Sequence, residues 1–72
     1  MPKPIALKII IKVLTEKGFV FVRQKGSHAR YRKKNSKKTV NVTLKTTKKE
    51  VPYGTFRSIV LQSGLREEDF LA

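Results

Sequence analysis

The chain has 72 residues and no cysteine, and its seventeen Lys and Arg residues against five Asp and Glu residues give a formal net charge of +12. This length suits one domain covering residues 1–72. The absence of cysteine excludes disulfide bonds and thiolate metal sites, and it fits a cytoplasmic protein. No apolar segment approaches the roughly 20 residues that cross a bilayer. A field this positive attracts polyanions, among which nucleic acid is the first candidate and an anionic membrane surface the second.

The first predicted element is an amphipathic helix that starts at Pro4 and ends before Gly18. Proline suits the first helical position, where its missing N–H costs no hydrogen bond, and Gly18 would cap the C-terminus. The helix has too few aromatic anchors for a membrane-surface role, so we predict no membrane partner. The apolar residues that recur at helical spacing and form its buried face are Ala6, Leu7, Ile10, Val13 and Leu14.

Three antiparallel strands are predicted next, at residues 19–22, 28–32 and 39–44. The first is aromatic and β-branched, and the third alternates apolar with polar residues. Gly26 and Ser27 form a two-residue loop between the first two strands. In that loop glycine supplies the positive φ of a type II′ turn.

The C-terminal part is predicted to be a basic loop at residues 45–52, a second helix, and a last helical turn at residues 66–71. Thr55 is the expected N-cap of the second helix and Gly64 its end. Phe70 and Leu71 are expected to anchor the last turn against the core. The order helix, three strands, helix defines an α+β fold. Both helices are expected on one face of the antiparallel sheet, which leaves the other face open to a ligand.

The predicted hairpin gathers cations around the single histidine of the sequence. With residues 26–27 as its loop, Lys25 lies opposite His28. In the same register Arg23 lies opposite Arg30. Because side chains alternate along a strand, one sheet face is expected to carry Arg23, Lys25, His28, Arg30 and Arg32.

The aromatic residues of the hairpin divide between the two faces. Tyr31 is expected on the inner face together with Ala29. Phe19 and Phe21 are expected on the same face as His28, where their rings would offer surfaces for base stacking. A shift of the register by one residue would bury these two rings instead.

An imidazole in such a cluster suits cleavage of RNA. Nearby cations favour the neutral form of His28 by like-charge repulsion, and a neutral imidazole can take the proton of a ribose 2′-hydroxyl. The cations would stabilise negative charge that develops on the phosphate. Lys25, Tyr31 and water are the candidate general acids for the leaving 5′-oxygen. The alternative interpretation is a surface histidine without a function that happens to lie on a basic sheet. Spacing alone identifies only a candidate catalytic residue.

Other reaction classes find little support in the residue inventory. Glu67, Glu68 and Asp69 are contiguous, and neighbours on a helix do not converge on one ion, so a two-metal nuclease site is disfavoured. No glycine-rich phosphate loop is present, and no acid is placed to orient a Ser27–His28 hydrolase pair. We therefore expect neither a metal nor another cofactor.

A second basic cluster precedes and enters the second helix. Free N–H groups at a helix N-terminus and adjacent cations together bind phosphate well. Solvated charge is the alternative interpretation. The candidate phosphate-binding residues of this cluster are Lys45, Lys48, Lys49 and Arg57.

The sequence resembles the HicA toxin family. The resemblance begins at Gly26-Ser27-His28 and Tyr31, and continues through residues 50–59. It ends in residues 62–65 and 67–70, so it spans nearly the whole chain in order. The Gly-Ser-His triplet alone is a weak signal. Its combination with the Gly-Thr-x-Arg-x-Ile helix and the Gly-Leu stop is specific.

This resemblance implies a small ribonuclease with a fold like a double-stranded-RNA-binding domain. Members cleave messenger RNA until a HicB antitoxin covers the active face, and the family's catalytic histidine falls on His28. Many members carry a second histidine near the end of the third strand, whereas residues 42–47 contain none here, and Arg66 stands where a capping Ser is common. A non-catalytic RNA-binding module is the alternative, since the fold and the charge support it equally. A DNA-binding role has less support, because the second helix carries Arg57 and Arg66 only near its ends.

Overall fold

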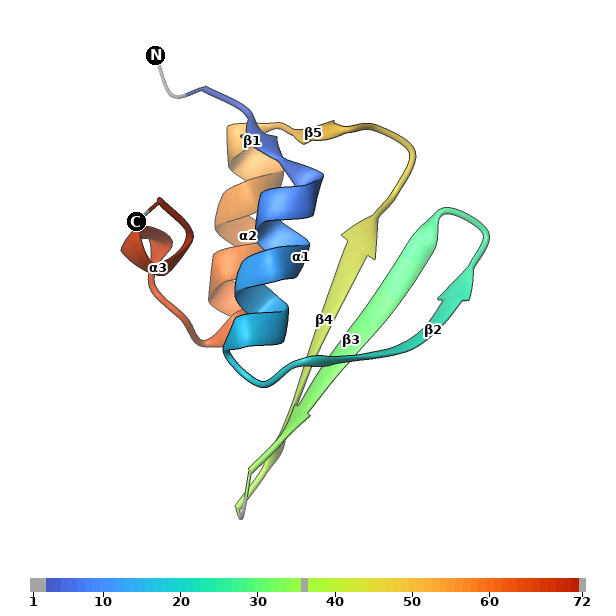
Figure 1. The fold of residues 1–72 in the computed structure, drawn as a ribbon, viewed down its shortest axis with the longest axis vertical. Coiled ribbons are helices and arrows are strands. Elements are labelled where there is room, and N and C mark those ends of the chain that lie inside the picture. Colours follow the sequence, from blue (N-terminus) through green and yellow to red (C-terminus); the bar gives the residue numbers. More distant parts are fainter. Residues whose placement is uncertain (1–2, 36, 72) are drawn as a thin grey trace.

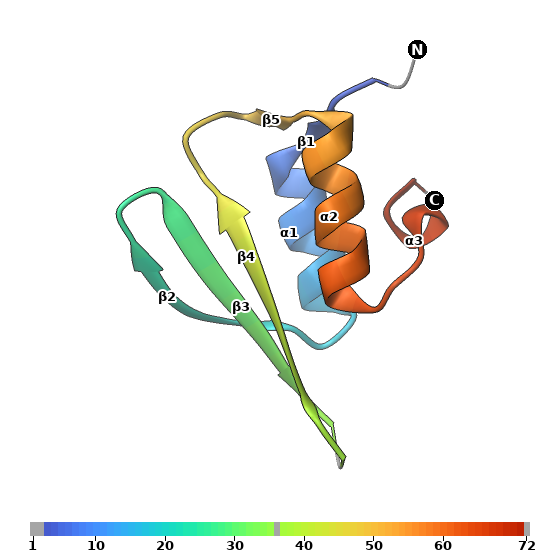
Figure 2. The ribbon, with the colours of Figure 1, turned by 180° about the vertical axis from the view of Figure 1, so that it is seen from behind.

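A computed structural model describes residues 3–35 and 37–71. The strands are β1 (Ile5–Ala6), β2 (Val20–Lys25), β3 (His28–Lys34), β4 (Thr39–Lys45) and β5 (Glu50–Val51), and the helices are α1 (Leu7–Glu16), α2 (Tyr53–Ser63) and α3 (Glu67–Leu71). Strands β2, β3 and β4 form an antiparallel sheet in that order. Both long helices lie side by side on one face of this sheet (Figures 1 and 2). The predicted α+β arrangement, like that of a double-stranded-RNA-binding domain, is therefore confirmed.

The N-terminus differs from the prediction. Pro4 and Ala6 lie outside the helix, because residues 5 and 6 pair antiparallel with Val51 and Glu50. Helix α1 begins only at Leu7, whose N–H donates to the Lys49 carbonyl at 2.8 Å. The segment predicted as an unstructured basic loop thus supplies a short strand. A pairing partner more than forty residues away outweighed the local helical pattern.

The turn from α1 into the sheet depends on Gly18, whose φ of 98° is the left-handed conformation that glycine adopts without strain. Phe19 follows and is only 1% exposed. The sequence predicted it as the first residue of a strand, but it belongs to the core. Strand β2 instead covers residues 20–25, and the hairpin turn at Gly26 has the expected positive φ of 59°. Strand β3 continues through Lys34, two residues beyond the end that the sequence predicted.

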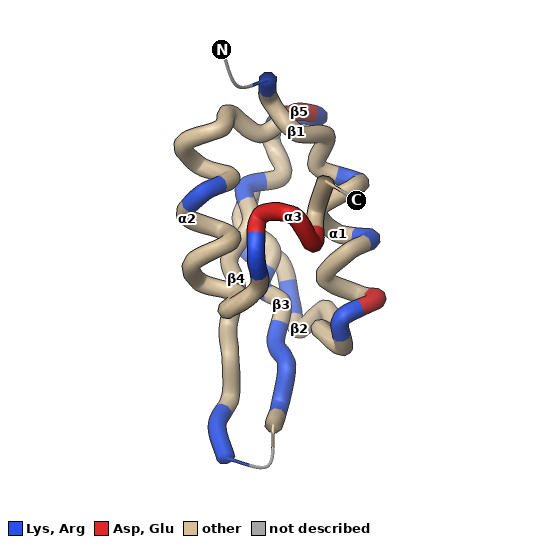
Figure 3. Tube along the Cα trace, turned by 90° about the vertical axis from the view of Figure 1, so that its left-hand side faces the viewer, with Lys and Arg blue, Asp and Glu red and all other residues tan. Residues whose placement is uncertain are grey.

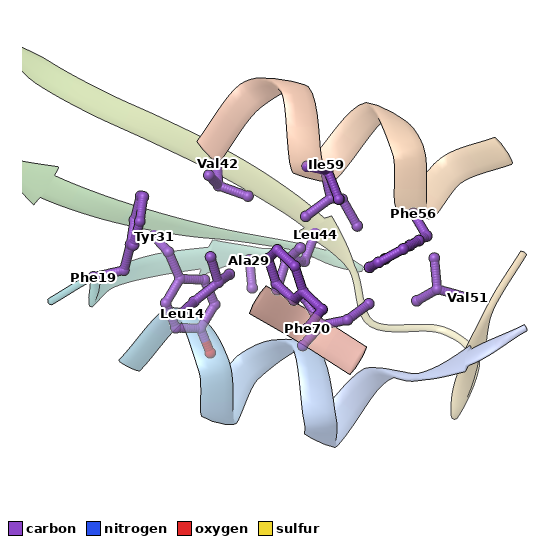
Figure 4. Packing of buried hydrophobic residues seen from close by; sticks show 12 residues of the cluster. Leu14, Phe19, Ala29, Tyr31, Val42, Leu44, Val51, Phe56, Ile59 and Phe70 are labelled. Atoms are coloured by element: carbon purple, nitrogen blue, oxygen red, sulfur yellow. The ribbon is translucent and has the colours of Figure 1, made fainter. Parts of the chain in front are cut away.

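Both helices and the inner face of the sheet close over one apolar cluster. Helix α1 contributes Ile10 and Leu14, which are fully buried. The ring of Phe56 from α2 meets that of Phe70 from α3 edge-on, with centroids 5.4 Å apart. Figure 4 shows these side chains converging from helices and strands. The buried members are Ile10, Leu14, Phe19, Ala29, Tyr31, Val42, Leu44, Val51, Phe56, Ile59, Val60 and Phe70.

The second helix starts two residues before the predicted N-cap. It begins at Tyr53 after Pro52, without a side-chain cap, so the prediction of Thr55 as its N-cap was wrong. Its predicted end is confirmed, because Gly64 has a φ of 72°. The Gln62 side chain accepts a hydrogen bond from the Thr43 backbone N–H at 3.2 Å and so satisfies one donor on the outer edge of β4.

Phe70 anchors helix α3 in the core as predicted, whereas Leu71 does not, because it is 57% exposed. The start of α3 is capped by a residue within the helix and not by a preceding Ser. The Asp69 carboxylate accepts the Arg66 backbone N–H at 2.9 Å, which is the reciprocal half of a capping box. This backbone hydrogen bond is the main cause that holds the pKa of Asp69 below its usual value. Arg66 can therefore replace a capping Ser without leaving its own N–H unpaired.

Candidate active site and nucleic-acid face

The strand register places His28 between two lysines. On β2 its partner is Lys25, as predicted, and on β4 its partner is Lys45. Paired residues present their side chains on the same face, so one imidazole lies in a row with two ammonium groups. The sequence assigned Lys45 to a separate cluster, and the sheet brings it to the candidate catalytic histidine.

A second row of the sheet extends this cluster. Arg23 pairs with Arg30, as predicted, and Arg30 pairs with Thr43 on the other side. Together with Lys25 and His28, these three residues line an open depression of about 440 Å³. All five residues of the depression are exposed, so a polyanion has direct access to the histidine. The arrangement can hold a phosphate beside a potential base.

The hairpin loop just before His28 is held by hydrogen bonds from two neighbouring segments. The Gln24 side-chain amide donates to the Gly26 carbonyl at 3.0 Å and to the Thr46 hydroxyl at 3.4 Å. The Thr46 N–H and hydroxyl both donate to the Ser27 carbonyl, at 2.7 and 3.2 Å. These contacts connect the hairpin loop to the chain just after β4. Sequence reasoning missed Gln24 and Thr46, because no local pattern reveals a contact between residues 22 positions apart.

The predicted stacking platform is absent from this face. Phe19 is buried in the core. The register shifts between Phe21 and Arg23, so Phe21 pairs with Tyr31 and its ring meets the Tyr31 ring edge-on at 5.7 Å. Tyr31 is buried on the inner face, opposite to His28. Of the candidate general acids in the chain, Lys25 lies beside the histidine and Tyr31 does not.

The structure keeps part of the predicted phosphate cluster at the second helix together. Lys45 pairs with His28, and it also lines, with Lys48 and Thr55, a small depression of about 180 Å³ near the start of α2. Lys49 lies against α1, where it lines an apolar groove with Leu7 and Ile11. Arg32, which was predicted to bind RNA, is on the same face as His28, and its Nε donates to Asn41 at 3.1 Å.

Arg57 contacts a residue of the helical layer and not of the sheet face. Its guanidinium donates to the Glu67 carboxylate at 2.9 Å, and the Tyr53 hydroxyl donates to the same carboxylate at 2.8 and 3.0 Å. The hydrogen bond to Glu67 is the main cause that raises the pKa of Tyr53. These contacts tie α2 to α3. Arg57 therefore forms an ion pair within the helical layer, away from the His28 row.

Comparison with known protein families identifies the family of this chain. The family model described as the HicA toxin of bacterial toxin–antitoxin systems matches residues 8–65. The chain belongs to the HicA toxin family. The match covers the whole β2–β3–β4 sheet and helix α2, and it includes His28 with both of its lysine neighbours. As a HicA family member the protein is a toxin with an antitoxin counterpart.

No curated protein matches the sequence. Within residues 3–35 and 37–71, no helix has the length and apolar character to span a membrane. The same described ranges contain no group of three His, Cys, Asp or Glu side chains that could hold a metal ion.

Proposed function

We propose that this HicA protein is a metal-independent endoribonuclease that cleaves messenger RNA with His28 as its catalytic residue. The observation that carries the proposal is the row Lys25–His28–Lys45 on the exposed sheet face. A base flanked by fixed positive charges is what transfer of a ribose 2′-proton beside a phosphate requires.

In the proposed reaction the neutral His28 imidazole removes the 2′-hydroxyl proton. The 2′-oxygen then forms a bond to the adjacent phosphorus, and the bond from phosphorus to the 5′-oxygen breaks. Lys25 and Lys45 stabilise the charge on the non-bridging oxygens. The leaving 5′-oxygen takes a proton from Lys25 or from water. The products are a 2′,3′-cyclic phosphate and a 5′-hydroxyl, so DNA, which lacks the 2′-hydroxyl, is not a substrate.

We also propose that a HicB-type antitoxin inhibits the enzyme by covering this face. A cationic sheet surface favours an acidic cover by charge complementarity. Because the proposed substrate is messenger RNA, we place the reaction in the cytoplasm. Binding of the antitoxin to the folded toxin would also stabilise it by mass action.

The test is an RNA cleavage assay in excess EDTA that compares the wild type with His28→Ala. Removal of the base is expected to lower the cleavage rate by about 10²- to 10⁴-fold. Lys12→Ala, an exposed change on α1, is the matched control and should cleave like the wild type. Circular dichroism verifies that all three proteins are folded, and analysis of the 3′ ends should find the cyclic phosphate. Equal cleavage by His28→Ala would contradict the catalytic assignment.

The alternative is a non-catalytic RNA-binding module. One observation favours it: the basic face extends past the depression to Arg32, whose guanidinium is held by Asn41. This basic face is larger than the area that a phosphate beside one catalytic histidine would contact. The module predicts salt-sensitive binding of RNA by the wild type and recovery of intact RNA in the assay above.

A further inference from the structure

The outer face of β3 carries a regular row of side chains from the loop of one hairpin to the tip of the next. Every second residue of β3 points to this face, and these residues are His28, Arg30, Arg32 and Lys34. Successive members of the row are about 6.6 to 6.8 Å apart along the strand. This spacing is comparable with the separation of successive phosphates in an extended single strand of RNA.

We propose that this row, extended by Lys37 and Lys38 at the tip of the β3–β4 hairpin, is a binding track for an extended single strand of RNA. The inference rests on the proposed function and deepens it, because it specifies the form of the substrate and the path that the RNA takes from His28. The track begins at the candidate catalytic histidine and runs along β3 for about 20 Å. The hairpin projects beyond the helices (Figures 1 and 2), so the RNA meets no helix along this path.

The charge of the track is not neutralised by neighbouring acids. Residues 18–49, which include the whole sheet, contain no Asp or Glu. Figure 3 shows Lys and Arg along the strands and at the hairpin tip, whereas the acidic residues concentrate on α3. Lys34, Lys37 and Lys38 are exposed and lie where an extended strand would leave the sheet. These cations are available to replace the counterions of an RNA backbone.

Two adjacent lysines of β3 lie on opposite faces of the sheet, and only one of them belongs to the row. Lys33 points to the inner side, where its Nζ lies 5.9 Å from the centre of the buried Phe19 ring. Its aliphatic stem also packs at 3.4 Å from the position that a Cβ would take on Gly18. Lys34, the next residue, is exposed on the outer side. Lys33 therefore packs against the core, whereas Lys34 belongs to the proposed RNA-binding track.

The geometry favours a single strand over a duplex. A nearly straight row of cations matches a strand that can be drawn out along it, whereas phosphates of an A-form duplex follow a curved path around a deep groove. The proposed chemistry has the same requirement, because the 2′-oxygen can align with the leaving 5′-oxygen only when the nucleotide leaves regular helical geometry. Among the described residues the row itself carries no aromatic ring, since the exposed Phe21 pairs with Tyr31 on the inner side, so binding along the row depends on phosphates more than on base stacking.

The test measures binding of 2′-O-methyl RNA oligonucleotides, which cannot be cleaved by the proposed reaction, over a series of salt concentrations. The track variant combines Lys34→Gln, Lys37→Gln and Lys38→Gln. The control variant has the same net charge and combines Lys3→Gln, Lys8→Gln and Lys12→Gln, all at exposed positions before and in α1. Circular dichroism and thermal unfolding verify that both variants are folded.

We expect the track variant to reduce the slope of log affinity against log salt by about 2, since each lost single-strand phosphate contact contributes about 0.7. The control variant should keep the wild-type slope to within one contact. Equal losses in both variants would show that only the overall field matters and would overturn the track. Tighter binding of a duplex than of the single strand would overturn the choice of substrate form.

The outcome is separable from that of the cleavage assay, because the oligonucleotides report binding without reaction. If the track variant lowers the salt slope but the wild type leaves RNA intact in the cleavage assay, the proposal of the track stands and that of the nuclease fails. Cleavage that depends on His28 together with an unchanged slope would retain the nuclease and reject the track.

Discussion

The two sides of this small protein use their lysines and arginines in opposite ways. On the helical side, Arg57 pairs with Glu67 at 2.9 Å and Lys17 pairs with Asp69 at 3.7 Å. On the sheet side, His28 lies between two lysines and no acid occurs in residues 18–49. Charge that is paired contributes to holding helices together, whereas unpaired charge remains available to a ligand.

This division has an energetic consequence. Clustered like charges repel one another and destabilise the compact state. The exposed helical ion pairs offset little of this, because pairs in water are worth about 0–1 kcal/mol. The apolar cluster between the helices and the sheet must therefore supply most of the stability. Changes on the two sides are expected to separate stability from function.

The largest effect is expected in the core of the helical side. Phe56 is fully buried against Phe70, and Phe56→Ala should lower the free energy of unfolding by about 3–5 kcal/mol. That loss is a large part of the stability of a small domain. Urea denaturation measures it, with Leu61→Ala on the same helix as the control, because Leu61 is 75% exposed. Equal midpoints for the two variants would mean that the cluster does not carry the stability.

An intermediate effect is expected at the loop that positions His28. Thr46→Val removes the hydroxyl that donates to the Ser27 carbonyl and accepts from Gln24. The loss of one or two hydrogen bonds, each worth roughly 0.5–1.5 kcal/mol, should lower kcat for RNA cleavage about tenfold. KM should change little, because the cations that bind RNA remain in place.

The controls for this variant distinguish positioning from general damage. Thr46→Ser keeps the hydroxyl and should restore kcat, and Thr47→Val alters the exposed neighbour without touching the Ser27 carbonyl. A purely structural role would lower the unfolding midpoint of Thr46→Val and leave kcat per folded molecule unchanged. That result would remove Thr46 from the positioning of His28.

The smallest effect is expected where the charges are already paired. Glu67→Gln removes the carboxylate that accepts the Tyr53 hydroxyl, so the raised pKa of Tyr53 should fall toward its ordinary value. Because the folded pKa is raised, the folded state gains stability below the usual tyrosine range and loses it as the pH rises through the folded pKa. The variant should show less of this alkaline loss. Ultraviolet titration of the Tyr53 phenol measures the shift, and Glu68→Gln is the control because Glu68 pairs with the exposed Arg66. An unchanged Tyr53 titration in Glu67→Gln would show that this contact does not form in solution.

Local patterns predicted those parts of the fold that depend on neighbours in the chain. The loop at Gly26 and Ser27 fixed the pairing of Lys25 with His28 and of Arg23 with Arg30. Gly64 ended the second helix as expected, because the left-handed conformation suits glycine. The predicted stacking surface at Phe19 and Phe21 was wrong because Phe19 is buried just before β2 begins and the register shift in β2 pairs Phe21 with Tyr31, on the side away from His28. No residue in that segment signals the shift.

The sequence by itself determined the basic character of the protein, the order of the two long helices and the three-stranded sheet, and the pairing of His28 with Lys25, since charge and hairpin geometry are local properties. Only the tertiary structure brought Lys45 beside His28, tied Thr46 to the Ser27 carbonyl and drew Arg57 away to Glu67. Each of these contacts joins residues that are ten or more positions apart, and their side-chain types are compatible with many partners. Packing of the helices on one sheet face selects among those partners, because it decides which polar groups meet.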